Sequence, residues 1–340
     1  MDVTYRFLDP DDAELLPAAI RSAYGDSYDL DWVYDVEEVR RRLDDGRYTS
    51  MAAISAEGAM LCHGGMAKTN AADRVGHSGQ AITLKEARGQ HLYSEVKRRL
   101  VDFAIERDWA GLYSEATAVH PYSQKAILSV GSVETGVLLG WIPRAVQNDA
   151  ATSPRSPDIA PGRYRQSAVL FYKRTNDGSE RPIYAPTHYA EMVEAIAQSA
   201  QLRGTITALP KGAQLTGRTR LHTEIEQRHN LAVIHVHEPG DDLVEEVRAV
   251  RHHLFHHGLD AVYIDLPLEH PGTALVTDHV KELGASFAGV FPNTRADGDV
   301  LRMQSLHKHC VEPGEVQVAS DHGSELLTFV LEDLERNQPR

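Results

Sequence analysis

The chain has few cysteines, no long apolar run and no excess of basic side chains. Its two cysteines, Cys62 and Cys310, are far apart and form neither a metal-binding nor a redox motif. We therefore expect buried, reduced thiols in a cytoplasmic protein. No run of about 18 apolar residues occurs, which excludes a membrane-spanning helix. The first residues, MDVTYRFLDPDD, lack the basic and apolar regions of a secretory signal.

The net charge of the 340 residues is −14, from 35 basic and 49 acidic side chains. A surface of this charge would repel a phosphate backbone, so nucleic acid is not an expected partner. It would tolerate a cationic amine as a substrate. With 42% hydrophobic and 25% charged residues, the composition is that of a globular protein, and the length suits two domains.

The first 68 residues predict a strand, two helices and two further strands. Asp9 and Pro10 start the first helix, which runs to about Tyr24, with Asp9 as its cap. Asp35 is the predicted cap of the second helix. The predicted strands are 3–8, 51–55 and 59–68, and the second helix covers 36–43.

Residues 81–93 (AITLKEARGQHLY) are predicted to form the end of a strand, a turn and the start of a helix. Apolar residues from Leu92 to Phe103 recur at helical spacing. Lys97 belongs to the mixed-charge remainder of this helix. The first turn of a helix has unpaired N–H groups and a partial positive charge, so this end is an anion site, and Arg88 with Gly89 lies on it.

A strand, a short helix ending on glycine and two more strands are predicted next. The strands cover 111–119, 133–142 and 166–175, the helix covers 120–131, the proline-containing loop covers 143–163, and the interdomain linker covers 176–182.

This order of elements resembles the GCN5-related N-acetyltransferase (GNAT) family. Motif A of that family, Q/R-x-x-G-x-G/A, holds the pyrophosphate of acetyl-CoA with backbone N–H groups. Arg88 falls on its first position and Gly89 on the second, while His91 and Tyr93 stand where the family has glycine.

A second family pattern, N-x-x-A-x-x-x-Y-x-x-x-G, aligns with the following helix. His120 falls on the Asn, Ser123 on the Ala and Gly131 on the final Gly. Ile127 replaces the Tyr that commonly protonates the leaving thiolate in this family.

The resemblance implies an α/β fold with a mixed, mostly antiparallel sheet flanked by helices. It also implies acetyl-CoA, or another acyl-CoA, as co-substrate, and no metal. The residues that it assigns to acyl-CoA are Ile82, Thr83, Leu84, Arg88, Gly89, Gln90, His91, Leu92, Tyr93 and Ser123, with the backbone N–H groups of 82–84 as donors to the carbonyl oxygen.

Acyl transfer to an amine needs a base, a donor to the oxyanion and a route for the thiolate to leave. Glu115, His120 and Tyr122 are the candidate catalytic residues. Glu115 shares a strand face with Tyr113, and a plain surface role for it stays open. His120 can titrate near neutral pH, but a structural role is equally open because His-Pro also starts a helix in the second half.

In the GNAT fold, the loop between the first two helices lies over the acceptor site. Aromatic faces together with carboxylates suit an ammonium group. The alternative is an aromatic loop that simply packs on the sheet. The candidate substrate residues are Tyr24, Tyr28, Asp31, Trp32 and Tyr34.

The second half repeats the order of the first. Residues 111–140 (GLYSEATAVHP…GSVETGVLLG) and 258–292 (GLDAVYIDLPLEHP…GASFAGVFP) both contain a strand, His-Pro, a helix, a glycine and a strand, which indicates duplication. At the place of the anion turn, residues 237–242 carry three carboxylates that would repel pyrophosphate. A strand over 315–319 and a helix over 321–334, capped by Ser320, are predicted to end the chain.

Four histidines on one predicted helix form i, i+4 pairs that could bind Zn²⁺. No third ligand is evident in the sequence, so a solvated helix face is the expectation. These residues are His252, His253, His256 and His257.

Residues 1–178 are therefore expected to be a GNAT-like, acyl-CoA-binding catalytic domain. Residues 183–340 are expected to be a degenerate copy that is structural or forms a wall of the acceptor site. The expected activity is direct transfer of an acetyl or other short acyl group from acyl-CoA to a small amine in a ternary complex. The alternative is a non-catalytic acyl-CoA sensor or protein-interaction scaffold. No nucleic acid or membrane partner is expected, and a homodimer is compatible with either function.

Overall fold

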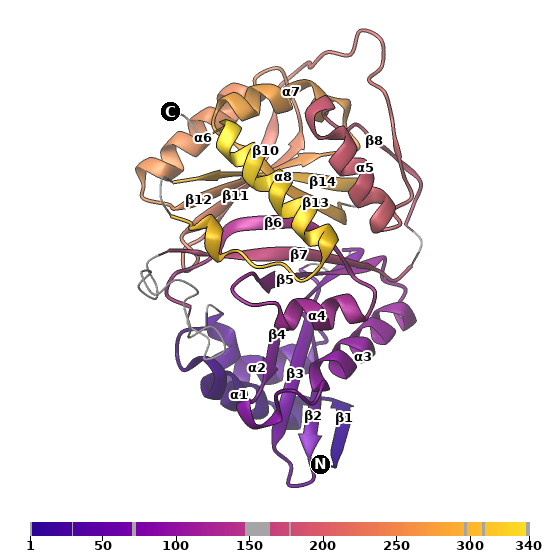
Figure 1. Ribbon diagram of the computed structural model, residues 1–340, viewed down its shortest axis with the longest axis vertical. Coiled ribbons are helices and arrows are strands. Elements are labelled where there is room, and N and C mark those ends of the chain that lie inside the picture. Colours follow the sequence, from indigo (N-terminus) through magenta and orange to yellow (C-terminus); the bar gives the residue numbers. More distant parts are fainter. Residues whose placement is uncertain are drawn as a thin grey trace.

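The computed structural model describes residues 2–28, 30–69, 73–146, 164–176, 178–295, 298–307 and 310–337. In the N-terminal half (Figure 1) the elements are β1 (Val3–Phe7), α1 (Leu15–Tyr24), α2 (Val36–Asp44), β2 (Tyr48–Ser55), β3 (Met60–Ala67), β4 (Val75–Thr83), α3 (Leu92–Glu106), β5 (Gly111–Thr117), α4 (Tyr122–Ser129), β6 (Val133–Ile142) and β7 (Gln166–Arg174). In the C-terminal half they are β8 (Arg181–Ile183), α5 (Ala190–Ser199), β9 (Gly204–Ile206), β10 (Arg220–Glu226), β11 (Leu231–Glu238), α6 (Leu243–His256), β12 (Ala261–Pro267), α7 (Pro271–Glu282), β13 (Ser286–Arg295), β14 (Gly298–Leu306) and α8 (Asp321–Asn337).

Twelve strands form one sheet in the order β1-β2-β3-β4-β5-β7-β6-β13-β14-β12-β11-β10, and β8 pairs with β9 separately. The pairs β4–β5 and β11–β12 are parallel, while the other neighbours in the sheet are antiparallel. The expected mixed, mostly antiparallel α/β fold is thus confirmed. The sequence left open whether the two halves share a sheet, and the structure joins them.

The junction between the halves is the pairing of β6 with β13, where Gly136 lies opposite Gly289. Both strands have a register shift immediately before this glycine. Within its own half, Gly136 pairs with Leu170 and Gly289 pairs with Arg302. The same local arrangement therefore occurs on both sides of the junction.

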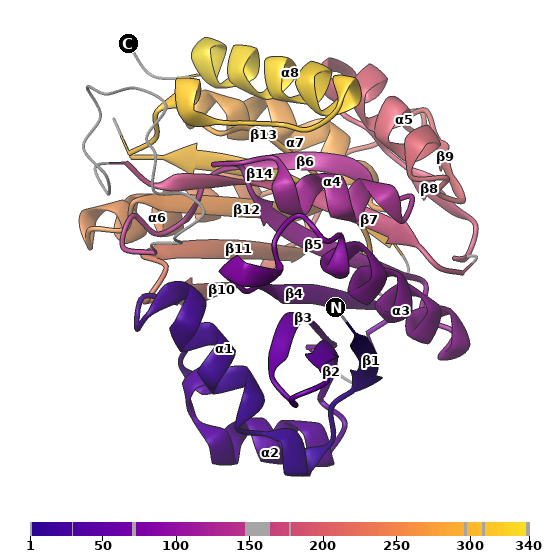
Figure 2. The ribbon, with the colours of Figure 1, turned by 60° about the horizontal axis from the view of Figure 1, so that its bottom comes forward.

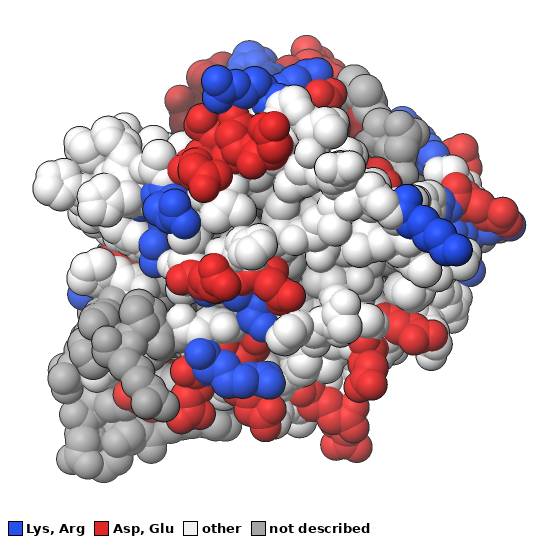
Figure 3. All heavy atoms as spheres, turned by 90° about the horizontal axis from the view of Figure 1, so that it is seen from above, with Lys and Arg blue, Asp and Glu red and all other residues white. Residues whose placement is uncertain are grey.

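Helices cover the two faces of the sheet unequally. In Figure 2, α1 and α2 lie on one side of the sheet, while α3, α4, α5, α7 and α8 lie on the other. None of the helices in the described ranges is long and apolar enough to span a membrane. On the face of the C-terminal half shown in Figure 3, acidic and basic side chains are interspersed.

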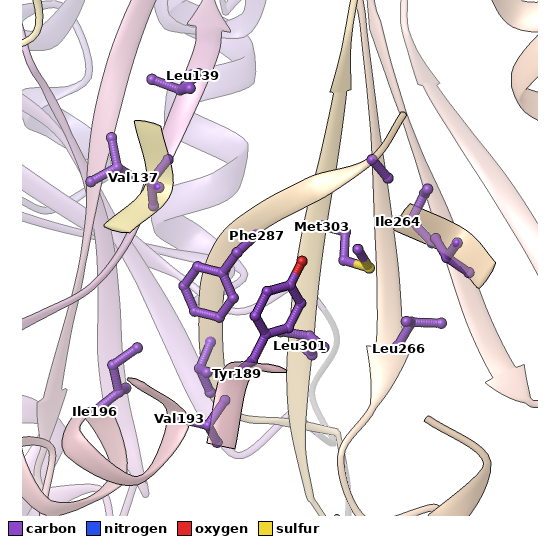
Figure 4. Packing of buried hydrophobic residues seen from close by; sticks show 14 of the residues in the cluster. Val137, Leu139, Tyr189, Val193, Ile196, Ile264, Leu266, Phe287, Leu301 and Met303 are labelled. Atoms are coloured by element: carbon purple, nitrogen blue, oxygen red, sulfur yellow. The ribbon is translucent and has the colours of Figure 1, made fainter. Parts of the chain in front are cut away.

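One hydrophobic core crosses the junction. Val137 and Leu139 of β6 belong to the same buried cluster as Phe287, Leu301 and other residues of the C-terminal half (Figure 4). The carboxylate of Asp333 on α8 accepts hydrogen bonds from the Tyr189 hydroxyl at 2.7 Å and from the backbone N–H of Phe287 at 2.8 Å. Because the hydrophobic cluster contains residues of both halves, the halves are packed as one body rather than as separate globules.

The predicted helix caps are present. Asp9 accepts a hydrogen bond from the N–H of Asp11, although the predicted first helix is divided into a 3₁₀ turn at Pro10–Asp12 and α1. Asp35 accepts from the N–H groups of Glu37 and Glu38 at the start of α2.

The strand predicted over 315–319 is wrong. The segment starts with a 3₁₀ turn at Pro313–Glu315, and the backbone N–H of Gln317 donates to the carbonyl of Ala118 at 2.6 Å. Its polar groups are satisfied by the loop after β5 instead of by a neighbouring strand. Ser320 does cap α8, because its hydroxyl accepts from the N–H of Gly323 at 2.8 Å.

The predicted linker at 176–182 contains the start of β8. Arg181 is 6% exposed and forms a bidentate ion pair with Asp299 on β14, at 2.9 and 2.6 Å. The linker is thereby tied to the C-terminal sheet. Most of the loop predicted over 143–163 lies outside the described residues.

Candidate functional site

The strands β4 and β5 separate near the middle of the N-terminal half. They pair in parallel over Val75–His77 and Gly111–Tyr113. Beyond that, β4 continues to Thr83 and β5 to Thr117, and no further pairing between them occurs in the described residues. Because side chains alternate along a strand, His77 lies on the same face as Tyr113 and Glu115.

A histidine–carboxylate pair stands where the strands part. Nε2 of His77 lies 2.6 Å from a carboxylate oxygen of Glu115, and the two side chains are 36% and 12% exposed. Burial raises the pKa of Glu115, but His77 and then Arg302 outweigh this, and the net pKa is below its ordinary value. Glu115 is therefore ionised at neutral pH, and Nδ1 is the ring nitrogen of His77 left for proton transfer.

The sequence analysis missed His77. The signal was present, since strand alternation puts His77 and Glu115 on one face once β4 and β5 are parallel neighbours. The pairing of β4 with β5 joins residues that are far apart in the chain, so a local sequence pattern does not predict it.

The turn before α3 contains two residues in the left-handed backbone conformation. Gly89 has φ of 77° and His91 has φ of 57°, and both are exposed. His91 stands at a glycine position of motif A and keeps the left-handed conformation that glycine favours. Arg88 is exposed, and its Nε donates to the carbonyl of Thr83 at 3.4 Å.

Other residues assigned to acyl-CoA have roles inside the fold. The N–H of Leu84 donates to the carbonyl of Leu61, so it is used within the sheet. Ile82 and Leu92 are buried in the core, Thr83 and Tyr93 are half-buried, and Gln90 is exposed.

A second polar group lies at the start of α4. Both ring nitrogens of His120 and Oε1 of Gln124 are buried and have no hydrogen-bond partner among the residues that the structure describes. Burial lowers the pKa of His120, and the charge of Arg88 lowers it further, so the imidazole is neutral. Buried polar atoms without partners are rare, and a ligand or water would satisfy them.

Two further candidate residues, Tyr122 and Ser123, follow His120 at the start of α4. The ring of Tyr122 lies 5.0 Å from that of His120 and is 68% exposed, and Ser123 beside it is half-buried. Ile127, at the family's tyrosine position, is 3% exposed and belongs to the core.

Lys97 is a buried residue of α3, not part of its charged surface as expected from the sequence. It is 1% exposed, and its Nζ lies 2.8 Å from the hydroxyls of Ser78 on β4 and Ser114 on β5. Burial lowers the pKa of Lys97 to about 7. The amine therefore bridges the two strands just beyond their last paired residues, on the face opposite His77.

The aromatic loop after α1 contacts β2 of the sheet. The ring of Trp32 lies 4.9 Å from that of Tyr48 on β2, and Tyr24 and Tyr28 are 4.7 Å apart. The hydroxyl of Tyr34 donates to the carbonyl of Gly25. Tyr24, Tyr28, Trp32 and Tyr34 are all half-buried beside a core cluster.

The C-terminal half reaches this loop. Arg228, in the turn between β10 and β11, forms an ion pair with the exposed Asp31. On β12, Asp265 forms a bidentate pair with Arg302 at 2.6 and 2.7 Å and contacts Nδ1 of His235 at 3.0 Å. A histidine–carboxylate pair therefore also stands on β11 and β12, the parallel pair of the second half.

The matching anion turn in the C-terminal half is filled by the chain itself. The N–H of Gly240 donates to the hydroxyl of Thr219 and the N–H of Asp241 donates to the carbonyl of Gly217, both at 3.0 Å. Asp242 accepts from the N–H of Thr219 at 2.7 Å and pairs with Arg218 at 2.9 Å. The amides that could face a phosphate are thus bonded to residues 217–219.

The four histidines at the end of α6, including His257 just after its last residue, are exposed, as on a solvated helix face. Within the described ranges, no group of three His, Cys, Asp or Glu side chains is arranged to hold a metal ion.

Comparison with known proteins gives similarity of fold over about half of the chain. No protein-family model matches the sequence, and no curated protein matches it. Among solved structures, ribosomal-protein-S5-alanine acetyltransferase from Vibrio fischeri is 11% identical and matches 53% of this chain and 96% of its own, with a TM-score of 0.41.

Two further structures match to a similar extent. Spermidine N-acetyltransferase from Vibrio cholerae, in complex with CoA and spermine, is 16% identical over 51% of this chain and 95% of its own, with a TM-score of 0.38. A GNAT-family protein from Desulfovibrio desulfuricans is 14% identical over 51% of this chain and 99% of its own, also with a TM-score of 0.38. Over about half of its length, the chain is therefore similar to acetyltransferases of the GNAT family, at an identity that says nothing about its substrate.

Proposed function

We propose that this protein is an acyl-CoA-dependent N-acyltransferase that moves an acetyl or other short acyl group to an amine of a small molecule. The observation that carries the proposal is the pair of His77 and Glu115, which stands where β4 and β5 separate. The exposed turn at Arg88 and Gly89 and the unsatisfied nitrogens of His120 add to its support, because both suit an anionic, hydrogen-bonding ligand.

In this proposal the thioester supplies an activated acyl carbon. Nδ1 of His77 accepts the proton of the attacking amine, and Glu115 stabilises the imidazolium that forms. The amine nitrogen bonds to the acyl carbon, the C–S bond breaks, and the leaving thiolate takes up the proton held by His77 to become the CoA thiol. His77, rather than Glu115, is the base in this proposal. The lowered pKa of Glu115 makes its carboxylate a weak base.

One observation favours a non-catalytic acyl-CoA sensor instead. Ile127 is buried in the core, so the position that carries a tyrosine in the family cannot protonate the thiolate. A sensor would bind acyl-CoA without transferring the acyl group.

Release of CoA thiol with a panel of small amines, next to calorimetric binding of acetyl-CoA, separates the two functions. For the transferase, His77→Ala should reduce kcat by a hundredfold or more while acetyl-CoA still binds, as is common for loss of a general base. His252→Ala, on the solvated face of α6, is the control. Binding without turnover for every amine would support the sensor, and absence of binding would exclude both.

A further inference from the structure

The segment that leads into α8 (yellow in Figure 1) joins the C-terminal half to the loop that follows β5. The backbone N–H of Gln317 in this segment donates to the carbonyl of Ala118 at 2.6 Å, and its side-chain Nε2 donates to the carbonyl of Val119. On either side of Gln317, the side chains of Val316 and Val318 pack in the core cluster that crosses the junction. The second half therefore holds this loop of the first half by both polar and apolar contacts.

The same segment orients the side chain of Gln124, near the start of α4. Gln124 is 0% exposed, and its Nε2 donates to the carbonyl of Thr117 at 3.1 Å and to that of Gln317 at 2.8 Å. Because carbonyl oxygens only accept hydrogen bonds, the amide cannot turn over and present Oε1 to them. Oε1 of Gln124 is thus kept away from both carbonyls, and it is buried without a partner among the described residues.

His120 lies beside this amide. Nε2 of Gln124 is 3.4 Å from the backbone carbonyl oxygen of His120, and neither ring nitrogen of His120 has a partner in the described parts of the chain. A neutral imidazole has one donor and one acceptor nitrogen, so the two side chains together offer two acceptors and one donor. Buried groups left in this state cost free energy, which a bound partner recovers.

We propose that His120 and Gln124 form a binding subsite for a ligand group that carries an N–H, and that Gln317 of the second half positions this subsite. A donor is required because Oε1 of Gln124 can only accept. The inference rests on the proposed function and deepens it, since both reagents of that reaction offer an N–H: acyl-CoA in its amides and the acceptor in its amine. Neither Gln124 nor Gln317 is among the residues that the family resemblance assigns.

Adhesion between the halves explains only part of this arrangement. It accounts for Nε2 of Gln124, which bonds to a carbonyl of each half, but it leaves Oε1 unexplained. Other contacts of the same segment are complete: the hydroxyl of Ser320 donates to the carboxylate of Glu134 on β6 at 2.5 Å, and Nε2 of His322 lies 3.1 Å from the carbonyl oxygen of Glu134. Within the described ranges, neither of these two side chains leaves a buried polar atom unpaired.

Three variants of the full chain test the proposal. Gln124→Met keeps the length of the side chain and removes Oε1. Gln317→Met keeps the backbone contacts and removes the donor to Val119. His322→Ala is the matched control, because it removes a contact of the same segment with β6 and leaves the loop after β5 intact. Calorimetry measures the Kd of acetyl-CoA, steady-state kinetics measures the KM of the amine, and hydrogen exchange measures protection of the loop amides.

We expect Gln124→Met to weaken binding of one reagent by roughly threefold to tenfold, as is common for the loss of one hydrogen bond between neutral groups. A higher Kd for acetyl-CoA would identify an amide of the thioester substrate as the ligand group. A higher KM for the amine at an unchanged Kd would identify the acceptor. Gln317→Met should act in the same direction and speed the exchange of amides 118–120, whereas His322→Ala should match the wild type in all three measurements.

Unchanged Kd and KM in Gln124→Met would overturn the subsite and leave a buried water as the partner of Oε1. An equal loss in His322→Ala would also overturn it, because the effect would then come from the docking of the two halves. Unchanged exchange in Gln317→Met would refute the positioning by Gln317.

Should Gln124→Met not fold, NMR of the wild-type chain decides, with the ring signals of His120 assigned by means of His120→Asn. These signals should shift on saturation with acetyl-CoA or with the amine, and no shift with either would overturn the subsite. Binding of acetyl-CoA without turnover would count against the transferase and leave these comparisons standing.

Discussion

Gly136 and Gly289 face each other across the junction of the two halves so closely that neither could carry a side chain. A Cβ on Gly289 would lie 2.4 Å from the Cα of Gly136, and a Cβ on Gly136 would lie 2.6 Å from the carbonyl oxygen of Ala288. Both obstacles are backbone atoms, which cannot turn away. This close approach lets β6 and β13 continue one sheet and brings the cores of the two halves together.

A fragment of residues 1–178 should therefore be poorly soluble or inactive, although it holds His77 and Glu115. Cutting there exposes Val137 and Leu139, each worth roughly 1.5–3 kcal/mol when buried. Expression of the fragment with and without residues 179–340 supplied separately, followed by size-exclusion chromatography, measures this. A soluble fragment with full activity would show that the second half is an independent module.

Arg88→Ala should weaken binding of acetyl-CoA by roughly tenfold to a hundredfold. A charge-assisted hydrogen bond contributes about 1.5–3 kcal/mol, which corresponds to that range. Calorimetric titration measures the change. Arg107→Ala, just beyond the other end of α3, is the control and should bind as wild type. Undiminished binding by Arg88→Ala, or CoA at residues 238–243, would refute the assignment of the anion site to the first half.

Replacing Tyr28 and Asp31 should raise the KM for the amine acceptor much more than the KM for acyl-CoA. The physical reason is attraction between the ammonium group and an aromatic face with a carboxylate. Steady-state kinetics with each substrate varied in turn measures both constants.

Because Asp31 is paired with Arg228, the matched variant for this experiment is Arg228→Ala. If Asp31 binds the acceptor, Arg228→Ala should leave the acceptor KM unchanged or lower it, since it frees the carboxylate. If Asp31 only holds the turn between β10 and β11, both variants should have the same effect.

Lys97→Met should stabilise the protein most at low pH. The pKa of Lys97 is about 7 in the folded state and about 10.4 in the unfolded chain. Between these values the unfolded chain holds a proton that the folded protein has released, so wild-type stability rises with pH across this window. Below pH 7 the full cost of burying the charge remains.

The advantage of Lys97→Met should accordingly shrink by about 1.4 kcal/mol per pH unit from pH 7 towards pH 10. Ser78 and Ser114 lose their hydrogen-bond partner in the variant at every pH, and this loss changes the free energy of unfolding by the same amount throughout. Urea unfolding at pH 6, 7.5 and 9 measures the difference in the free energy of unfolding between the variant and the wild type. A difference independent of pH would contradict the lowered pKa of Lys97.

The sequence predicts features whose cause is local. Asp9, Asp35 and Ser320 cap helices because a side-chain oxygen reaches N–H groups two or three residues away. The similar order of elements in the two halves was likewise predicted from the spacing of strands and helices.

Features that depend on distant partners were not predicted. The polar groups near Gln317 bond to the loop after β5, so a segment with strand composition is not a strand. Lys97 sits at a position that looks solvent-exposed in the sequence, and only the serines of two other strands explain its burial. His77 pairs with Glu115 on a strand that is distant in the sequence, so the candidate site is visible only after the sheet is assembled.

The turn filled by residues 217–219 has a consequence for any free anion. Residues 217–219 belong to the same chain and compete with a free anion for the amides of this turn. Their effective concentration is in the millimolar range or above, and dilution of the protein does not lower it. Thr219 and Gly217 thus hold the amides of Gly240 and Asp241 at every protein concentration. Phosphate-containing metabolites would have to outcompete this built-in occupant and also overcome the carboxylate of Asp242, and both disfavour their binding to the second half.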